Sequence, residues 1–219
     1  MGTRSKLKAR TAGTGRWVFR HEQYVSWREN GDVLWISGRP GSGKSMLVDF
    51  IAAEEQARCP NTTTTVIPFF FYQGDGELHR SSAALYRTIL HKVLSRNGEA
   101  LSKFVTQSAF SERYQTRGPT KTTSDWQERE LREQCMACLQ MLVNEGQQVL
   151  IFIDAIDELA RGDMKRLVRD FRDLSVSSQH RSIFASLPDR TYWKTYTSTT
   201  KSVCTTRTGT TSHFSSTKD

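Results

Sequence analysis

Two groups of residues in this sequence have the types and the spacing needed to bind a phosphate chain and a divalent cation. The first fits the Walker A pattern G-x-x-x-x-G-K-[ST], and it reads Gly38-Arg39-Pro40-Gly41-Ser42-Gly43-Lys44-Ser45. Glycines let the backbone curl tightly and direct N–H groups at phosphate oxygens. Lys44 is therefore expected to reach the β- and γ-phosphates, and the Ser45 hydroxyl is expected to bind Mg²⁺.

The second group is a set of acids at the end of a continuous apolar run. This run begins at Val149 and ends in Asp154, and it overlaps the Walker B segment expected over 150–158. A carboxylate that closes a buried strand needs a partner charge, so Asp154 is expected to hold Mg²⁺ through water. Asp157 and Glu158 follow, and we expect them to position or activate an attacking water molecule. The alternative is that these two acids only cap the next helix.

Each group needs regular elements to position it, and the sequence supplies them. Residues 33–37 are apolar and β-prone, which predicts a buried strand before the glycine loop. Residues 46–53 are apolar at helical spacing, which predicts a helix to about Arg58 whose N-terminus favours phosphate. Residues 149–154 predict a second buried strand. We therefore expect an α/β fold, a three-layer αβα P-loop NTPase whose parallel sheet binds phosphates at its carboxyl ends.

The rest of the pattern predicts one domain over 15–190 between two disordered tails, a basic one at 1–14 and a Ser/Thr-rich one at 191–219. Further strands are expected at 64–72 and 182–187, with the second of these as the last strand. Pro68 removes one ladder bond, so its strand is expected to be bulged or near an edge. Helices are expected at 81–94, near 101–105, over 125–144 with Asp125 as the cap, and from 163, with a loop at 111–124.

The net charge of +8 belongs to the two ends of the chain. Residues 1–20 carry six basic side chains and no acid, whereas residues 21–189 carry 20 basic and 22 acidic ones. Basic ends are more often solvated tails than readers of nucleic acid, so nucleic acid is not an expected partner. The sequence has no run of about 18 apolar residues and no secretory signal, which predicts a cytoplasmic protein without a membrane span.

The chain also contains a lone C-x-x-C pair, Cys135 and Cys138. It lies inside a helical pattern and has no second cysteine pair or histidine pair at metal-ligand spacing. We expect both thiols to be reduced helix residues, and a zinc or redox site is the less favoured alternative.

The two groups with their flanks resemble the NACHT-type NTPase domain, in the nephrocystin-like N-terminal version common in fungal NOD-like (STAND) proteins. The residues that carry the resemblance are 35–45 and 152–159, supported by 69–72, 85–94 and the segment 13–17 with Trp27. The likeness covers about residues 13–188. It implies a signalling switch in which binding and hydrolysis of ATP or GTP with Mg²⁺ set the on and off states. Its expected partners are the nucleotide and other proteins or further copies of the chain.

This sequence departs from the family at a position that senses the γ-phosphate. The family has Ser-Ser-Arg-Pro there, whereas this chain has Ala185-Ser186-Leu187-Pro188. Leu187 lacks the charge and the donors of an arginine, and nothing in the sequence places Arg190 as a substitute. The family also continues into another strand and a helical lid. We therefore expect the C-terminal part of the sheet and the lid to be missing, as in a truncated gene product.

Three functions compete on this evidence. The first is a slow Mg²⁺-dependent ATPase or GTPase that works as a switch. The second is a catalytically incompetent NTPase-like interaction module or a fragment, which Leu187 and the missing lid favour. A nucleic-acid motor is weaker, because the central part of the chain is not basic.

Overall fold

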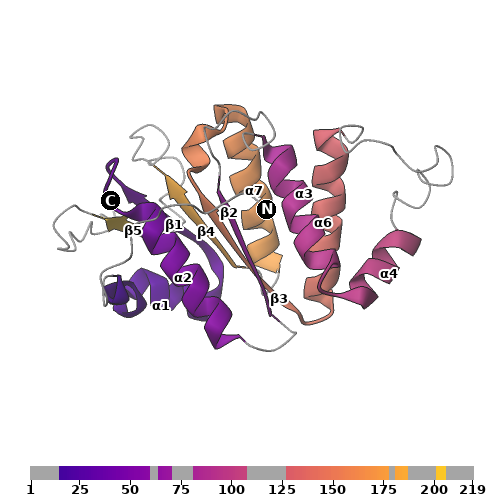
Figure 1. The fold of residues 1–219 in the computed structure, drawn as a ribbon, viewed down its shortest axis with the longest axis horizontal. Helices are drawn as coiled ribbons and strands as arrows, with labels where there is room; N and C mark the ends of the chain where they lie inside the picture. The colour runs from indigo at the N-terminus through magenta and orange to yellow at the C-terminus, as the bar shows by residue number, and fades with distance from the viewer. Residues whose placement is uncertain are drawn as a thin grey trace.

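The structure, a computed structural model, describes residues 15–59, 64–70, 81–107, 127–177, 181–186 and 201–205 (Figure 1). The strands are β1 (Asp32–Gly38), β2 (Thr64–Phe70), β3 (Gln148–Asp154), β4 (Arg181–Ser186) and β5 (Lys201–Thr205). The helices are α1 (Glu22–Asn30), α2 (Lys44–Arg58), α3 (Ser82–Leu94), α4 (Gly98–Gln107), α6 (Glu128–Asn144) and α7 (Arg161–Ser177). Two short 3₁₀ helices, η1 (Arg16–Arg20) and η4 (Ile156–Glu158), complete the described elements. None of these helices combines the length and the apolar character needed to cross a bilayer.

The strands form one parallel sheet in the order β2-β3-β4-β1-β5. β1 and β3, which carry the two predicted site groups, are separated only by β4. Because the strands run parallel, their carboxyl ends meet at one edge, where ligands bind in sheets of this kind. β2 forms one side of the sheet, which confirms the edge position expected from Pro68.

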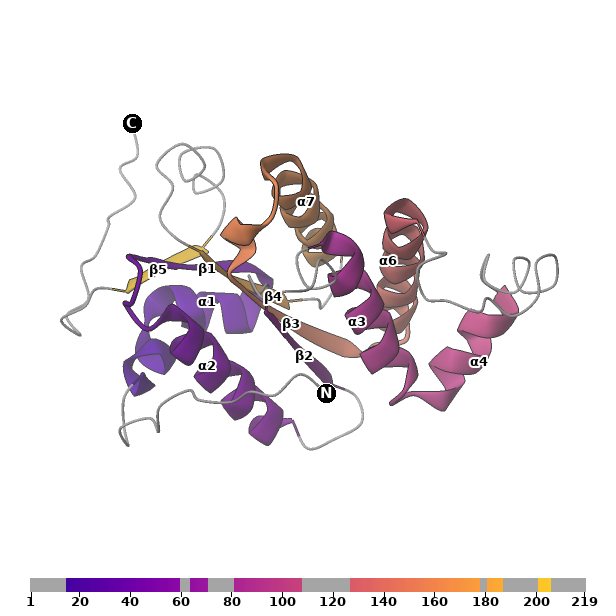
Figure 2. The same ribbon diagram turned by 45° about the horizontal axis from the view of Figure 1, so that its top comes forward.

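Helices cover both faces of the sheet, as Figures 1 and 2 show from two directions. α1 and α2 pack on one face, and α3, α6 and α7 pack on the other, with α4 against α3 and α6. Each helical layer shares a separate cluster of buried apolar side chains with the sheet. The three-layer αβα fold expected from the sequence is therefore confirmed.

The apolar run before Asp154 is explained by the position of β3 inside the sheet. Every residue from Val149 to Ile153 is fully buried. Leu150 and Phe152 belong to the cluster under α1 and α2, whereas Val149, Ile151 and Ile153 belong to the cluster under α3, α6 and α7. A strand with both faces covered shows no alternation of polar and apolar residues, because each face needs apolar side chains.

The prediction that residues 182–187 form the last strand and that 191–219 lack structure is wrong for residues 201–205. These residues form β5, which pairs in parallel with β1 from Leu34↔Lys201 to Gly38↔Thr205. A five-residue edge strand is held by backbone pairing with its neighbour, and the β-branched Val203 and Thr205 favour it. Such a short segment within a Ser/Thr-rich stretch leaves no periodicity for sequence analysis to detect.

One helix start also differs from its prediction. α6 begins at Glu128, and the backbone N–H of Gln127 donates to the Glu130 carboxylate at 3.2 Å. The helix is therefore capped at Gln127, two residues after Asp125, the expected cap. Asp125 itself, the expected loop at 111–124, the tail at 1–14, Leu187 and Arg190 lie outside the described residues.

Candidate functional site

The Walker A loop joins β1 to α2 through a backbone that only glycine adopts readily at two positions. Gly41 has a φ of 72° and Gly43 has a φ of 88°, both in the left-handed region. A Cβ atom at either glycine would meet no heavy atom within 4 Å, so the backbone angle and not crowding selects glycine here. The turn is closed by the Ser42 N–H, which donates to the Arg39 carbonyl at 3.1 Å. The loop therefore leaves open space over its backbone, as a phosphate cradle requires.

Lys44, the first residue of α2, folds back over this loop. Its Nζ donates to the carbonyl oxygen of Gly38 at 2.8 Å and to that of Arg39 at 3.2 Å. Partial burial lowers the pKa of the Lys44 ammonium, and the carboxylates of Asp157 and Asp154 oppose that shift. The Lys44 ammonium is thus held against the loop backbone, where the negative charges of Asp154 and Asp157 from the Walker B segment act on it.

Asp154 ends β3 with only 4% of its surface exposed. Burial raises the pKa of its carboxyl group. Hydrogen bonds from the Ser45 side chain and the Ala155 backbone N–H, together with the charge of Lys44, lower it, and the charge of Asp157 raises it. The structure therefore brings together Lys44, Ser45, Asp154 and Asp157, which the sequence had placed in two distant motifs.

The chain turns sharply after Asp154. Ala155 has a φ of 56°, the one left-handed non-glycine residue in the described part of the chain, and η4 follows at once. Asp157 is exposed and Glu158 is partly exposed on this 3₁₀ turn. α7 begins only at Arg161, so neither acid lies in its first turn. This arrangement argues against the alternative in which both acids serve only as helix caps.

The donor groups at this edge suit Mg²⁺. One hydroxyl, from Ser45, and one buried carboxylate, from Asp154, lie within hydrogen-bond reach of each other. Mg²⁺ in phosphate sites takes one or two protein oxygens and keeps several water molecules, so it does not need a cage of acids. Consistently, the described residues contain no cluster of three or more histidine, cysteine, aspartate or glutamate side chains that would form an all-protein metal site.

A model of the family described as Nephrocystin 3, N-terminal, matches residues 13–186, which include both motifs. The chain belongs to the nephrocystin-3 N-terminal family. This match confirms the NACHT-type, nephrocystin-like resemblance drawn from the sequence. Residues 13–186 also span every described element from η1 to β4.

The nephrocystin-like chain is also similar to parts of two larger proteins. Vegetative incompatibility protein HET-E-1 of Podospora anserina is 30% identical over 88 residues, which are 39% of this chain and 6% of that protein. A structure of the Aeropyrum pernix ORC1 protein in complex with DNA is 17% identical, with a TM-score of 0.45. That likeness covers 78% of this chain and 38% of the ORC1 chain. The fold assignment rests on the sheet order and the layers described above.

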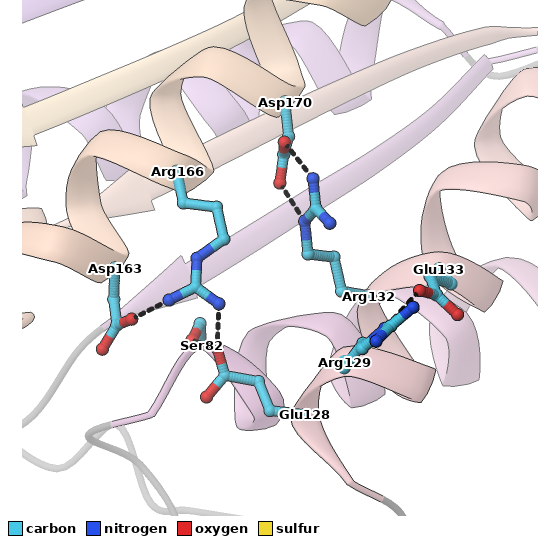
Figure 3. A network of polar contacts seen from close by, with 8 residues as sticks. All are labelled: Ser82, Glu128, Arg129, Arg132, Glu133, Asp163, Arg166 and Asp170. Carbon is cyan, nitrogen blue, oxygen red and sulfur yellow. Dashed lines mark hydrogen bonds and ion pairs between the residues drawn. The ribbon is translucent and has the colours of Figure 1, made fainter.

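Sequence reasoning missed a polar network that joins three helices of the nephrocystin-like domain (Figure 3). On α6, Arg132 donates to both carboxylate oxygens of Asp170 on α7, each at 2.6 Å. The buried Ser82 hydroxyl of α3 donates to Glu128 of α6 at 2.6 Å, and Arg166 of α7 lies 3.7 Å from the same Glu128 carboxylate. These pairs are 38 to 46 residues apart in the chain, so no local spacing could reveal them.

A second missed group surrounds Glu55, a fully buried acid on α2. Its Oε1 accepts a hydrogen bond from the Tyr24 hydroxyl at 2.5 Å and pairs with Arg28 at 3.1 Å and Arg58 at 3.4 Å. Helical spacing from Ile51 and Ala52 puts Glu55 on the buried stripe of α2, but an acid between Glu54 and Gln56 gives no sign that partners await it there. The group ties α1 to the helix that begins with Lys44.

The two cysteines of the C-x-x-C pair lie on α6 in the core, as predicted. Burial raises the pKa of Cys135 well above its usual value, and the charge of Cys138 adds to this effect. Burial also raises the pKa of Cys138 to about 11, with a further contribution from Glu145. Both groups are therefore protonated thiols at neutral pH, with little nucleophilic or metal-binding character.

Proposed function

We propose that this nephrocystin-like domain binds ATP or GTP with Mg²⁺, hydrolyses it slowly, and works as the switch core of a NOD-like signalling protein. The single observation that supports this most is the convergence of Lys44 and Ser45 with Asp154 at the carboxyl edge of the sheet. A strand-loop-helix element alone could be a glycine-rich turn. A Walker lysine within the field of a buried strand-end carboxylate is the arrangement that phosphoryl transfer requires.

Binding would depend on the loop and on Lys44. The left-handed glycines, Gly41 and Gly43, orient backbone N–H groups over open space, while Arg39, Pro40 and Ser42 complete the curve. Lys44 would exchange its two carbonyl acceptors for the β- and γ-phosphate oxygens, which carry more charge. The N-terminal end of α2 adds a favourable field for the same anion.

The cation would lie between the two motifs. A cation held there would supply positive charge to neutralise the phosphate oxygens. Ser45 would contribute its hydroxyl oxygen, and Asp154 would hold the ion through a water molecule. This role also gives the buried Asp154 carboxylate the positive partner that its burial calls for.

Hydrolysis would use the acids of η4. Asp157 is exposed, and its charge acts on both Lys44 and Asp154, which supports a role for it at the phosphate end of the proposed site. Asp157 would orient the attacking water, and Glu158, on the same turn, is the second candidate for accepting its proton. The left-handed Ala155 fixes the turn before η4, and both roles are compatible with this conformation of the turn.

The binding claim is tested by equilibrium titration of the chain with fluorescent ATP and GTP analogues, with Mg²⁺ and with EDTA. We expect micromolar, Mg²⁺-dependent binding that Lys44→Ala abolishes. A conservative exposed change on α6, Arg129→Lys, is the matched control and should leave the affinity unchanged. Equal affinity of wild type and Lys44→Ala, or no binding by a folded chain, would contradict the proposal.

A second candidate function is a catalytically incompetent interaction module with the same fold. It is favoured by Leu187, which stands where the family has its sensing arginine. Single-turnover hydrolysis separates the two functions: a switch NTPase should turn over slowly and lose most of its rate in Asp157→Asn. A module should bind nucleotide and show equal background release for wild type and variant.

The signalling role rests on relatives of which this chain spans only a part. HET-E-1 is named for vegetative incompatibility, and this chain matches 6% of it. We extend to this domain a role in a larger signalling protein of the cytoplasm, in which nucleotide state controls contacts with protein partners or with further copies. ATP and GTP remain equal candidates, because no base-reading residue is apparent in either motif.

A further inference from the structure

A cleft lies between η1 and the second half of α2. It has a volume of about 470 Å³, and its lining residues come from η1 and the second half of α2: Arg16, Trp17, Phe19, Arg20, Glu54 and Arg58. Glu54 and Arg58 follow Lys44 by roughly 15 and 21 Å along the helix axis, at 1.5 Å per residue. The cleft is therefore separate from the proposed nucleotide site. Its size is within the range of sites that hold small ligands or peptide side chains.

The charge of this cleft is unbalanced. Three guanidinium groups face one carboxylate, that of Glu54. Arg16 and Arg20 are exposed, and within the described ranges neither has an ion pair. Arg58 shares its carboxylate partner, Glu55, with Arg28, so that carboxylate is already compensated. A positive field of this kind attracts acidic partners and steers their approach.

Two aromatic rings, Trp17 and Phe19, form the apolar part of the cleft, and Phe19 is held in place by the core. The Phe19 ring packs edge-on against Phe50 and Tyr24, each with centroids 5.2 Å apart, and the Arg58 guanidinium lies 4.8 Å from the Phe19 centroid. Gly15 permits this close packing, because a Cβ atom there would come within 3.0 Å of Phe50. The surface is thus formed before any ligand arrives, which lowers the entropy cost of binding.

We propose that this cleft binds an acidic peptide segment of a partner protein, anchored by one aromatic or aliphatic side chain. The Trp17 and Phe19 rings would contact the anchor, and the guanidinium groups of Arg16 and Arg20 would pair with carboxylates on either side of it. Glu54 favours a peptide over a polyphosphate or a nucleic-acid backbone, because its carboxylate can accept a peptide N–H and those backbones offer no such donor. Aromatic and arginine side chains are also the residues most enriched in protein-binding sites.

The test uses the full chain without nucleotide or Mg²⁺, so its result is independent of the proposed nucleotide function. The probe is a short fluorescein-labelled peptide in which aspartates and glutamates surround one phenylalanine. We expect saturable binding by fluorescence anisotropy, weakened about tenfold or more when Arg16→Glu and Arg20→Glu are combined. Replacing the peptide phenylalanine with alanine should weaken binding as well, because the aromatic walls then lose their partner.

Two matched variants separate a site from general charge attraction. Arg129→Glu changes an exposed arginine on α6, and Lys8→Glu changes a lysine in the basic N-terminal stretch. Both should leave peptide affinity within about twofold of wild type. The proposal is overturned if either control weakens binding as much as the cleft variants, or if no peptide binding is measurable. It is also overturned if an oligothymidylate of equal length binds more tightly at the same salt concentration.

Discussion

The Asp154 carboxylate at the end of β3 accepts a hydrogen bond from the side chain of Ser45 in the first turn of α2. This contact joins Asp154, the last residue of the Walker B strand, to Ser45, the last residue of the Walker A motif. It crosses the sheet edge between β3 and β1, which are separated by β4. The Ser45 hydroxyl is a weak neutral donor to the Asp154 carboxylate. A divalent cation placed between these two groups would give that carboxylate a positively charged partner instead.

The first prediction concerns the cost of burying Asp154. Its carboxyl pKa is raised by burial above the reference value of 3.8, so the folded state binds this proton more tightly than the unfolded state. The free energy of unfolding therefore falls as pH rises from the unfolded-state pKa through the folded-state pKa, and the loss is constant above it. In the absence of Mg²⁺ we expect Asp154→Asn to stabilise the chain at pH 7 by on the order of 1 kcal/mol.

Urea unfolding of wild type and Asp154→Asn at neutral pH and near pH 4 measures this effect. The stabilisation should shrink at the lower pH, since burial raises the pKa of the wild-type carboxyl and a larger fraction of it is then protonated in the folded state. A variant that is less stable than wild type at neutral pH would show that the Asp154 charge is already well compensated without a cation.

The second prediction concerns the ion pair between α6 and α7. Asp170 has 4% of its side chain exposed and receives two hydrogen bonds from Arg132 (Figure 3). Arg132→Ala leaves this carboxylate buried without a cation, so we expect a loss of about 2 kcal/mol in the free energy of unfolding. Denaturant titration gives the value. Arg129→Ala, in an exposed i,i+4 pair with Glu133, is the control and should have far less effect.

The third prediction concerns the link between α1 and α2. Tyr24→Phe removes one hydrogen bond to the buried Glu55 carboxylate, whose other oxygen has no hydrogen-bond partner among the described atoms. We expect a loss of about 1 kcal/mol in unfolding free energy, because a buried charged acceptor loses one hydrogen bond while Arg28 and Arg58 still pair with the same oxygen. Tyr86→Phe is the matched control, since Tyr86 is equally buried and the described residues give its hydroxyl no hydrogen bond. Equal losses for the two variants would contradict the role given to the Tyr24 hydroxyl.

The fourth prediction concerns thiol reactivity. Cys135 and Cys138 are buried, and burial raises both pKa values, that of Cys138 to about 11. Native chain treated with iodoacetamide at pH 8 should be modified at the partly exposed Cys59 and spared at both α6 cysteines. Peptide mass spectrometry reads each site separately, and modification in urea is the control. Rapid native labelling of Cys138 would mean that α6 opens or that the C-x-x-C pair is reactive.

The sequence was sufficient for the features that local pattern determines. The glycine loop, the apolar β3 run ending in Asp154 and the helix after Lys44 follow from residue types that each local geometry requires. Pro68 indicated an edge strand, because proline lacks the ladder donor, and β2 lies at the side of the sheet.

Long-range features could not be predicted in this way. Residues 201–205 form β5 because their backbone pairs with that of β1. The five residues themselves carry no periodicity. Helical spacing puts Glu55 on the buried face of α2, but its partners Tyr24 and Arg28 come from α1, and no local pattern reveals them. The pairing of Arg132 with Asp170 likewise depends on how two helices cross.

The most direct test of the proposed site compares the Mg²⁺ dependence of nucleotide affinity in wild type, Ser45→Ala, Asp154→Asn and the double variant. Each titration uses the same fluorescent triphosphate analogue with Mg²⁺ and with EDTA. We predict that each single variant lowers the affinity in Mg²⁺ to nearly the EDTA level, and that the double variant lowers it little further, since both residues act through one ion. Full Mg²⁺ dependence in both single variants would contradict the assignment of the cation to Ser45 and Asp154.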